Sequence, residues 1–134
     1  MWSSGIKGGG IASASLYVKR AGVVDYDRSI GDFTRDDTWR ELDLSDVVPA
    51  GTQLIHCTLM LYPQADSFKM MWRSADDTTG HPIVATYADY QDKERRHEFM
   101  LPCNADRVVD YQGNTVAINT VNLTVIGYVL RVTA

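Results

Sequence analysis

The sequence predicts an all-β fold, an antiparallel sandwich or barrel, from three observations. Roughly eight short segments rich in β-branched and aromatic residues follow one another along the chain. Turn-forming residues separate them, as at Pro49-Ala50-Gly51 and Gln112-Gly113-Asn114. Near the C-terminus, apolar residues take every second position, which is the period of a half-buried strand. Short strands with turn signals between them are typical of an antiparallel β-sandwich or barrel.

The expected strands follow in order along the chain, and no segment makes a strong helix. Residues 88–99 contain good helix formers, but their apolar residues form no continuous stripe. We therefore expect a charged loop or an edge strand there. The expected strands cover residues 16–18 with 23–24, then 33–44, 53–62, 67–73, 82–90, 98–101, 107–111 and 115–132.

The last segment carries the clearest alternation. Val121, Leu123 and Val125 are separated by single residues of other types, so they should share the buried face of one strand. Gly127 then interrupts the pattern, as a β-bulge or a position of close approach would.

Four bulky or reactive side chains fit the interior of such a fold. Trp39 and Trp72 lie within strand patterns, where core packing is the default, although exposed aromatic rings could also stack on sugars. Cys57 and Cys103 each lie in an apolar run with no zinc-type spacing. We expect two reduced thiols in the core, and a disulfide stays open because sequence does not place the two strands.

Length and charge restrict the classes of function. The chain of 134 residues is long enough for one domain. It has 13 basic and 17 acidic residues, a formal net charge of −4, which disfavours nucleic-acid binding. No apolar run is long enough to cross a bilayer, and residues 1–15 lack a secretory apolar region, so we expect no membrane partner and synthesis in the cytoplasm.

Residues 1–15 are expected to form an extended N-terminal arm, followed by a single domain over residues 16–134. The arm is rich in Gly, Ser and Ala and holds few large apolar side chains, so it either docks on a neighbour or stays disordered. The first twenty residues carry three bases and no acid, whereas residues 25–46 carry eight acids and three bases. This asymmetry could steer the arm of one copy to the acidic face of another. The candidate docking residues are Trp2, Ile6, Lys7 and Ile11.

No pattern indicates catalysis. His56, His81 and His97 are scattered, without the spacing of a zinc site, and no nucleophile motif accompanies them. A small cupin-like enzyme would need a cluster of histidine and carboxylate ligands. We therefore expect neither an enzyme nor a cofactor.

One acidic stretch resembles part of a calcium loop. Asp25, Asp27 and Ser29 fit the first three ligand positions, but Ile30 occupies the position where the loop needs glycine. Strand-like segments also flank it where an EF-hand needs helices. We expect a solvated acidic loop and no metal.

Several segments together resemble a known family. The chain resembles the small jelly-roll domains of tailed-phage virion proteins, such as head decoration proteins, head fibres and tail-fibre tips, over approximately residues 37–130. The matching residues are Trp39, Leu42-Asp43-Leu44-Ser45, Val47-Val48-Pro49-Ala50-Gly51-Thr52 and Thr120-Val121-Asn122-Leu123-Thr124-Val125-Ile126-Gly127-Tyr128.

The resemblance implies a non-enzymatic jelly-roll β-sandwich, often trimeric, that attaches through an N-terminal segment. The chain lacks the collagen-like or coiled-coil stem of fibre members, which favours a capsid decoration, cement or head-fibre-like role on the virion. Its expected partners are the major capsid protein or another virion protein and further copies of itself, a trimer being favoured. The alternative is a receptor- or carbohydrate-binding tip module of a tail fibre.

Overall fold

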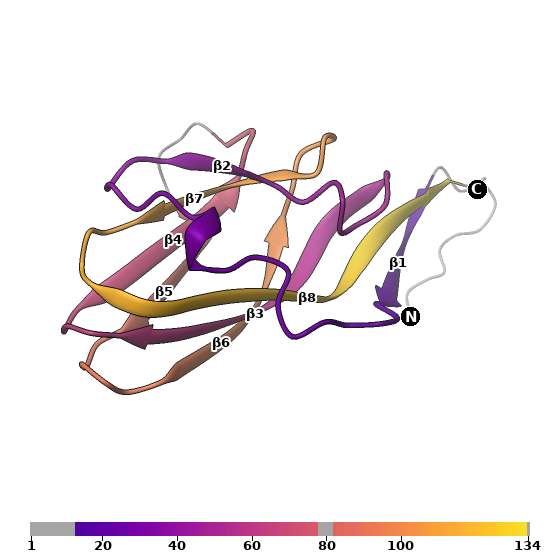
Figure 1. Cartoon of the computed structure of the whole chain (residues 1–134). Coiled ribbons are helices and arrows are strands. Elements are labelled where there is room, and N and C mark those ends of the chain that lie inside the picture. The colour runs from indigo at the N-terminus through magenta and orange to yellow at the C-terminus, as the bar shows by residue number, and fades with distance from the viewer. Residues whose placement is uncertain (1–12, 78–81, 134) are drawn as a thin grey trace, which may run out of the picture.

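The computed structural model describes residues 13–77 and 82–133, in which eight strands form two antiparallel sheets packed face to face (Figure 1). A single 3-10 turn, η2, spans Ile30–Asp32. The strands are β1 (Ser13–Lys19), β2 (Arg40–Asp43), β3 (Thr52–Pro63), β4 (Phe68–Ser74), β5 (Val84–Ala88), β6 (Arg95–Pro102), β7 (Val108–Gly113) and β8 (Ile118–Thr133).

The strand order identifies the sandwich as a jelly roll. One sheet has the order β1-β8-β3-β6 and the other β2-β7-β4-β5. Except between β4 and β5, each strand is followed along the chain by a strand of the opposite sheet. Eight strands alternating between two layers in this order make the two interlocked Greek keys of a jelly roll. The predicted fold class is therefore confirmed.

The core lies between the two inner faces and follows the alternation in the sequence. Val121, Leu123 and Val125 of β8 are fully buried, as predicted from their period of two. Trp72 of β4 is also fully buried, and its indole Nε1 donates to Thr86 Oγ1 at 3.2 Å. Burying each large apolar side chain contributes roughly 1.5–3 kcal/mol. The other fully buried side chains include Ile55, Cys57, Leu59, Leu61, Phe68, Met70, Leu101 and Val109.

Three sequence expectations are wrong in detail. Of the strand expected over residues 33–44, only Arg40–Asp43 is a strand, β2. Trp39 is not a core residue: it precedes β2 and is partly exposed, with the Arg73 guanidinium 4.0 Å above its ring. A cation over an indole face gives a tryptophan a stable place outside the core. Val23 and Val24 belong to no strand and are 44% and 47% exposed, because the chain leaves the sheet after β1. Residues 95–102 form the edge strand β6, one of the two alternatives expected for that region.

Gly127 is both a bulge position and a position of close approach. The register between β3 and β8 shifts there, because His56 pairs with Gly127 and Cys57 pairs with Val125. The ring of Tyr17, from β1, crosses β8 at this point, and a Cβ on Gly127 would lie 2.0 Å from the Tyr17 hydroxyl oxygen. Only a residue without a side chain leaves room for that crossing.

We expect the substitution Gly127→Ala to displace Tyr17 and lower the free energy of unfolding by about 1 kcal/mol, since the Tyr17 hydrogen bond to His56 would be lost. Urea denaturation measures the effect. The same substitution in a Tyr17→Ala background should cost much less, because no ring then occupies the space. Equal costs in both backgrounds would contradict this explanation.

Candidate functional site

The β1-β8-β3-β6 sheet, called the first sheet below, has an outer face that points away from the second sheet. The segment that follows β1 lies along the border of this outer face. Arg20 N donates to Ile126 O at 3.0 Å, which ends the regular pairing of that segment with β8. The chain then departs and returns, and Arg28 and Leu123 exchange backbone hydrogen bonds of 2.9 and 3.1 Å. Residues 21–26 therefore form a loop beside β8 that is tied to the strand at both of its ends.

Two side chains take the place of a strand between these ties. Asp27 Oδ2 accepts hydrogen bonds from Val125 N at 2.8 Å and from Arg20 Nη1 at 2.7 Å. Arg20 Nη1 also donates to Val125 O at 3.0 Å. The Asp27 side chain is only 5% exposed, so the ion pair is largely removed from water. We call this arrangement the Arg20–Asp27 clamp, because it satisfies the backbone of β8 and holds the loop in place.

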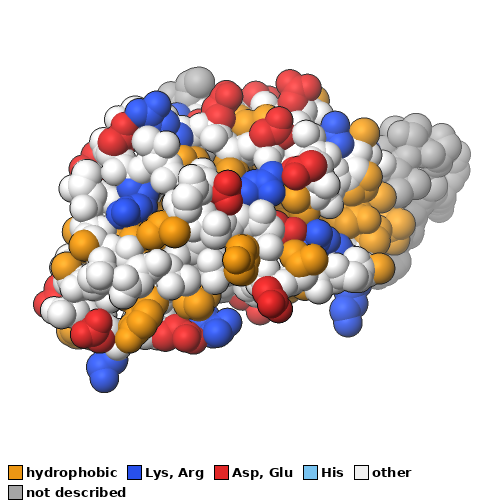
Figure 2. Space-filling model, in the orientation of Figure 1, with side chains coloured by type: hydrophobic (Ala, Val, Ile, Leu, Met, Phe, Trp, Pro, Cys, Tyr) orange, Lys and Arg blue, Asp and Glu red, His pale blue; other side chains and the backbone are white. Residues whose placement is uncertain are grey.

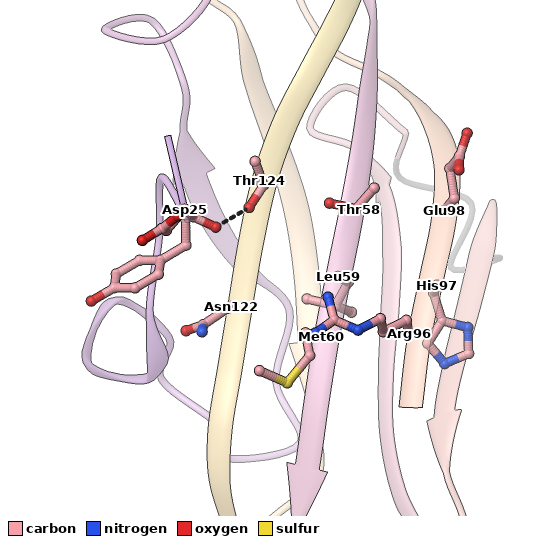
Figure 3. A pocket seen from close by; sticks show the side chains of 10 residues that line it. Asp25, Thr58, Leu59, Met60, Arg96, His97, Glu98, Asn122 and Thr124 are labelled. Carbon is pink, nitrogen blue, oxygen red and sulfur yellow. Dashed lines mark hydrogen bonds between the residues drawn. The ribbon is translucent and has the colours of Figure 1, made fainter. Parts of the chain in front are cut away.

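A groove lies between this loop and β6, on the outer face of the sheet (Figure 3). Its volume is about 680 Å³. Its floor consists of outward-facing side chains on the adjacent strands β8, β3 and β6, and the loop of residues 21–26 forms one wall. The Thr124 hydroxyl also holds this loop in place, because it donates to Asp25 O at 2.8 Å. Two cross-strand rows form the floor: Thr124, Thr58 and Glu98, then Asn122, Met60 and Arg96.

A chain of hydrogen bonds runs along one end of the groove. The Tyr17 hydroxyl lies 2.9 Å from His56 Nδ1, and His56 Nε2 lies 2.7 Å from Glu98 Oε2. An ionised carboxylate only accepts, so Nε2 carries a proton, and in the neutral imidazole Nδ1 accepts from the Tyr17 hydroxyl. The three residues come from β1, β3 and β6, and together they fix the Glu98 carboxylate at the edge of the groove.

The β1 end of the molecule is a second candidate site. Leu16 and Val18 pair with Leu130 and Tyr128, and Tyr128 in turn pairs with buried Ile55, so all five lie on the inner face of the sheet. Leu16 is nevertheless 51% exposed, because β1 extends past the end of the opposing sheet (Figure 1). Hydrophobic side chains gather at this end of the molecule (Figure 2). β1 is also an edge strand, with one side of its backbone unpaired by any described strand.

The docking residues predicted from the sequence, Trp2, Ile6, Lys7 and Ile11, lie outside the described residues, as does His81. Ser13–Ser15, at the end of the expected arm, begin β1. His97 Nε2 lies 2.8 Å from Tyr87 O, across to the other sheet, whereas His56 belongs to the outer face. The part of the chain that the structure describes contains no group of three or more histidine, cysteine or acidic side chains placed to hold a metal. None of its helical segments is long and apolar enough to cross a bilayer.

The acidic stretch that resembles part of a calcium loop has other contacts. Asp27 belongs to the clamp, and Ser29 N donates to Asp32 Oδ2 at 2.8 Å at the start of η2. The expectation of a solvated acidic loop is therefore wrong for Asp27, whose carboxylate is buried in an ion pair. It holds for Asp25, which is exposed.

Both cysteines are free thiols, in agreement with the expectation of reduced side chains. Cys57 is fully buried, and burial raises the pKa of its thiol to about 12. Burial also raises the pKa of Cys103, whose thiol donates to Thr52 O at 3.3 Å. Neither thiol has the lowered pKa of a reactive cysteine.

The groove and the Tyr17–His56 contact were missed by the sequence analysis. The groove is built across three strands, and which strands are neighbours could not be deduced from the chain. One signal was present in the sequence: the interruption at Gly127 marks the place where a side chain crosses the strand.

The solved chains that are similar to this one include three at 12–14% sequence identity, and no protein-family model and no curated protein matches the sequence. A chain of the Bacillus endospore appendages, described as a novel family of disulfide-linked pili, is 12% identical with a TM-score of 0.39, over 99% of this chain and 97% of that one. The Tobacco streak virus coat protein is 14% identical in two structures, with TM-scores of 0.37 and 0.36, over 90% and 89% of this chain and 86% and 84% of those. The jelly-roll assignment rests on the strand order of the chain itself.

We expect Asp27→Ala to lower the free energy of unfolding by roughly 2–4 kcal/mol, because it leaves the largely buried Arg20 guanidinium without a counter-ion and the Val125 N–H without a hydrogen-bond partner. Asp25→Ala is the matched control: it removes an exposed carboxylate two residues away and should change stability by less than about 0.5 kcal/mol. Chemical denaturation of both variants measures the difference. Equal effects would show that the clamp does not hold the loop.

Proposed function

We propose that this chain is a structural accessory protein of a bacteriophage virion, a capsid decoration, cement or head-fibre-like protein that acts by binding and turns over no substrate. It would be assembled onto the particle in the host cytoplasm. The observation that carries the proposal is the β1 end, where apolar side chains of the inner face lie uncovered at the strand that the N-terminal segment enters.

The physical argument begins with burial. Leu16 faces the same side of the sheet as fully buried Ile55, yet half of its surface is exposed. Burying that apolar surface against a partner would be favourable. The edge of β1 that pairs with no described strand adds backbone donors and acceptors for a partner to satisfy. A jelly roll with such an end is suited to assembly into a larger structure, and capsid domains are one use of this fold.

The N-terminal segment supplies the proposed anchor. Its large apolar residues, Trp2, Ile6 and Ile11, come before β1 in the sequence, close enough along the chain to reach the β1 end of the same or a neighbouring copy. Lys7 adds a positive charge that an acidic partner surface would attract. In this account the arm binds the major capsid protein or another virion protein.

Copies of the chain would also contact one another through the β1 end. Covering Leu16 and the open edge in an oligomer removes both apolar surface and unpaired backbone from water. A trimer is favoured by the resemblance to small jelly-roll domains of phage virions.

Deletion of residues 2–12 should leave the domain folded, since β1 begins at Ser13, and should abolish its attachment to phage particles. The assay adds purified protein to particles made from the encoding genome with this gene deleted, and measures cosedimentation. The variant Trp2→Ala with Ile6→Ala should weaken attachment, whereas Tyr90→Ala, which removes an exposed aromatic ring from the turn between β5 and β6, should not. Unchanged attachment after the deletion would refute the role of the arm.

The substitution Leu16→Lys should shift the protein from oligomer to monomer at micromolar concentration, because a charge cannot be buried in an apolar contact without a partner. Sedimentation velocity measures the change, with Tyr90→Lys as the control in the turn between β5 and β6. A monomeric wild-type protein, or an unchanged oligomer in the Leu16→Lys variant, would contradict the proposed contact.

A further inference from the structure

We propose that the groove on the outer face of the first sheet is a binding site for a neutral oligosaccharide. The groove is distinct from the β1 end and from the N-terminal arm, so this inference goes beyond the attachment role. Its volume of about 680 Å³ lies within the range of small-molecule sites, roughly 300–1,000 Å³.

The floor of the groove presents polar groups that the described protein does not use. The Asn122 amide and the Thr58 hydroxyl make no hydrogen bond to another described side chain or backbone group, and both line the groove (Figure 3). Glu98 is held through Oε2 by His56, which leaves Oε1 to accept. An amide, a hydroxyl and a carboxylate oxygen offer donors and acceptors side by side, which matches sugar hydroxyls because each of those both donates and accepts.

Apolar surface accompanies these polar groups. Met60 stands in the same cross-strand row as Asn122 and Arg96, and Tyr26, in the loop that forms one wall, is 49% exposed. A sugar ring combines hydroxyls at its edge with apolar C–H faces, so a thioether and an aromatic ring complete the set of contacts it needs.

The charges of the groove favour an uncharged ligand. The groove is lined by one base, Arg96, and by two acids, Glu98 and Asp25. Arg96 and Glu98 lie two residues apart on β6. Arg96 Nε donates a hydrogen bond to Glu94 Oε2 at 2.7 Å. This ion pair partly neutralises the charge of the Arg96 guanidinium and leaves its Nη groups to donate to a ligand. The acids outnumber the base, so the groove lacks the positive field of the basic clefts that bind phosphates or nucleic acids, and an uncharged ligand is favoured over an anionic one.

Most of these groups are held in fixed positions, whereas the Arg96 side chain is 71% exposed. Thr58, Met60 and Asn122 stand on the two central strands of the sheet, and His56 and Tyr17 fix Glu98. The clamp holds the opposing loop against β8. Since little side-chain or loop ordering would accompany binding, a small number of hydrogen bonds suffices for measurable affinity.

The test begins with the full-length, labelled chain on an array of neutral oligosaccharides and bacterial surface polysaccharides. Any neutral oligosaccharide that binds is then titrated in solution by calorimetry. We expect Asn122→Ala and Arg96→Ala each to weaken binding about tenfold, the loss expected for one hydrogen-bonding group. Gln91→Ala, which removes an exposed amide from the turn between β5 and β6, is the matched control and should bind like the wild type.

Because the Arg96 side chain is 71% exposed, we expect Arg96→Ala to fold normally. It therefore still tests the groove if Asn122→Ala proves unstable. Binding of no neutral oligosaccharide, or binding that both groove variants leave unchanged, would overturn the inference. The deletion of residues 2–12 should retain saccharide binding, so the failure of this inference and that of the attachment role are distinguishable.

Discussion

The long strand β8 sets the constraint on which the rest of the structure depends. It spans Ile118–Thr133, and it lies inside its sheet, so its backbone needs hydrogen-bond partners on both sides. β3 satisfies one side along most of this length, while β1 reaches only from Gly127 to Thr133 on the other. The Arg20–Asp27 clamp and the pairing of Arg28 with Leu123 continue that second side as far as Leu123.

Both candidate sites are consequences of how β8 is completed. Because side chains rather than a continuous strand fill the gap at Val125, residues 21–26 are free to form a raised wall, and the outer face beside that wall becomes a groove. At the other end of β8, β1 pairs beyond the reach of the opposing sheet, which leaves Leu16 uncovered. The groove is built from polar groups on rigid strands, whereas the β1 end offers apolar surface and an open edge. These are the properties of a recognition site and of an assembly contact, respectively.

The sequence predicted the fold more fully than the sites, and the reason is physical. Alternation at Val121, Leu123 and Val125 reports burial directly, and turn residues mark where strands end, so the class and the approximate strands follow from local pattern. Strand order depends on contacts between distant residues, and so does every feature built across strands. The pairing of Tyr17 with His56 spans 39 positions and that of Asp27 with Val125 spans 98, which no local pattern encodes. Trp39 was misplaced for the same reason, because Arg73 covers its ring from another strand.

We propose that the chain belongs to a phage particle as a bound structural component. Quantitative mass spectrometry of purified particles, with the major capsid protein as the internal standard, tests it most directly. The account predicts that the chain copurifies in a fixed ratio to the capsid protein, in a number consistent with the particle's symmetry. Absence of the chain from purified particles, together with its presence as free protein in the lysate, would contradict the account.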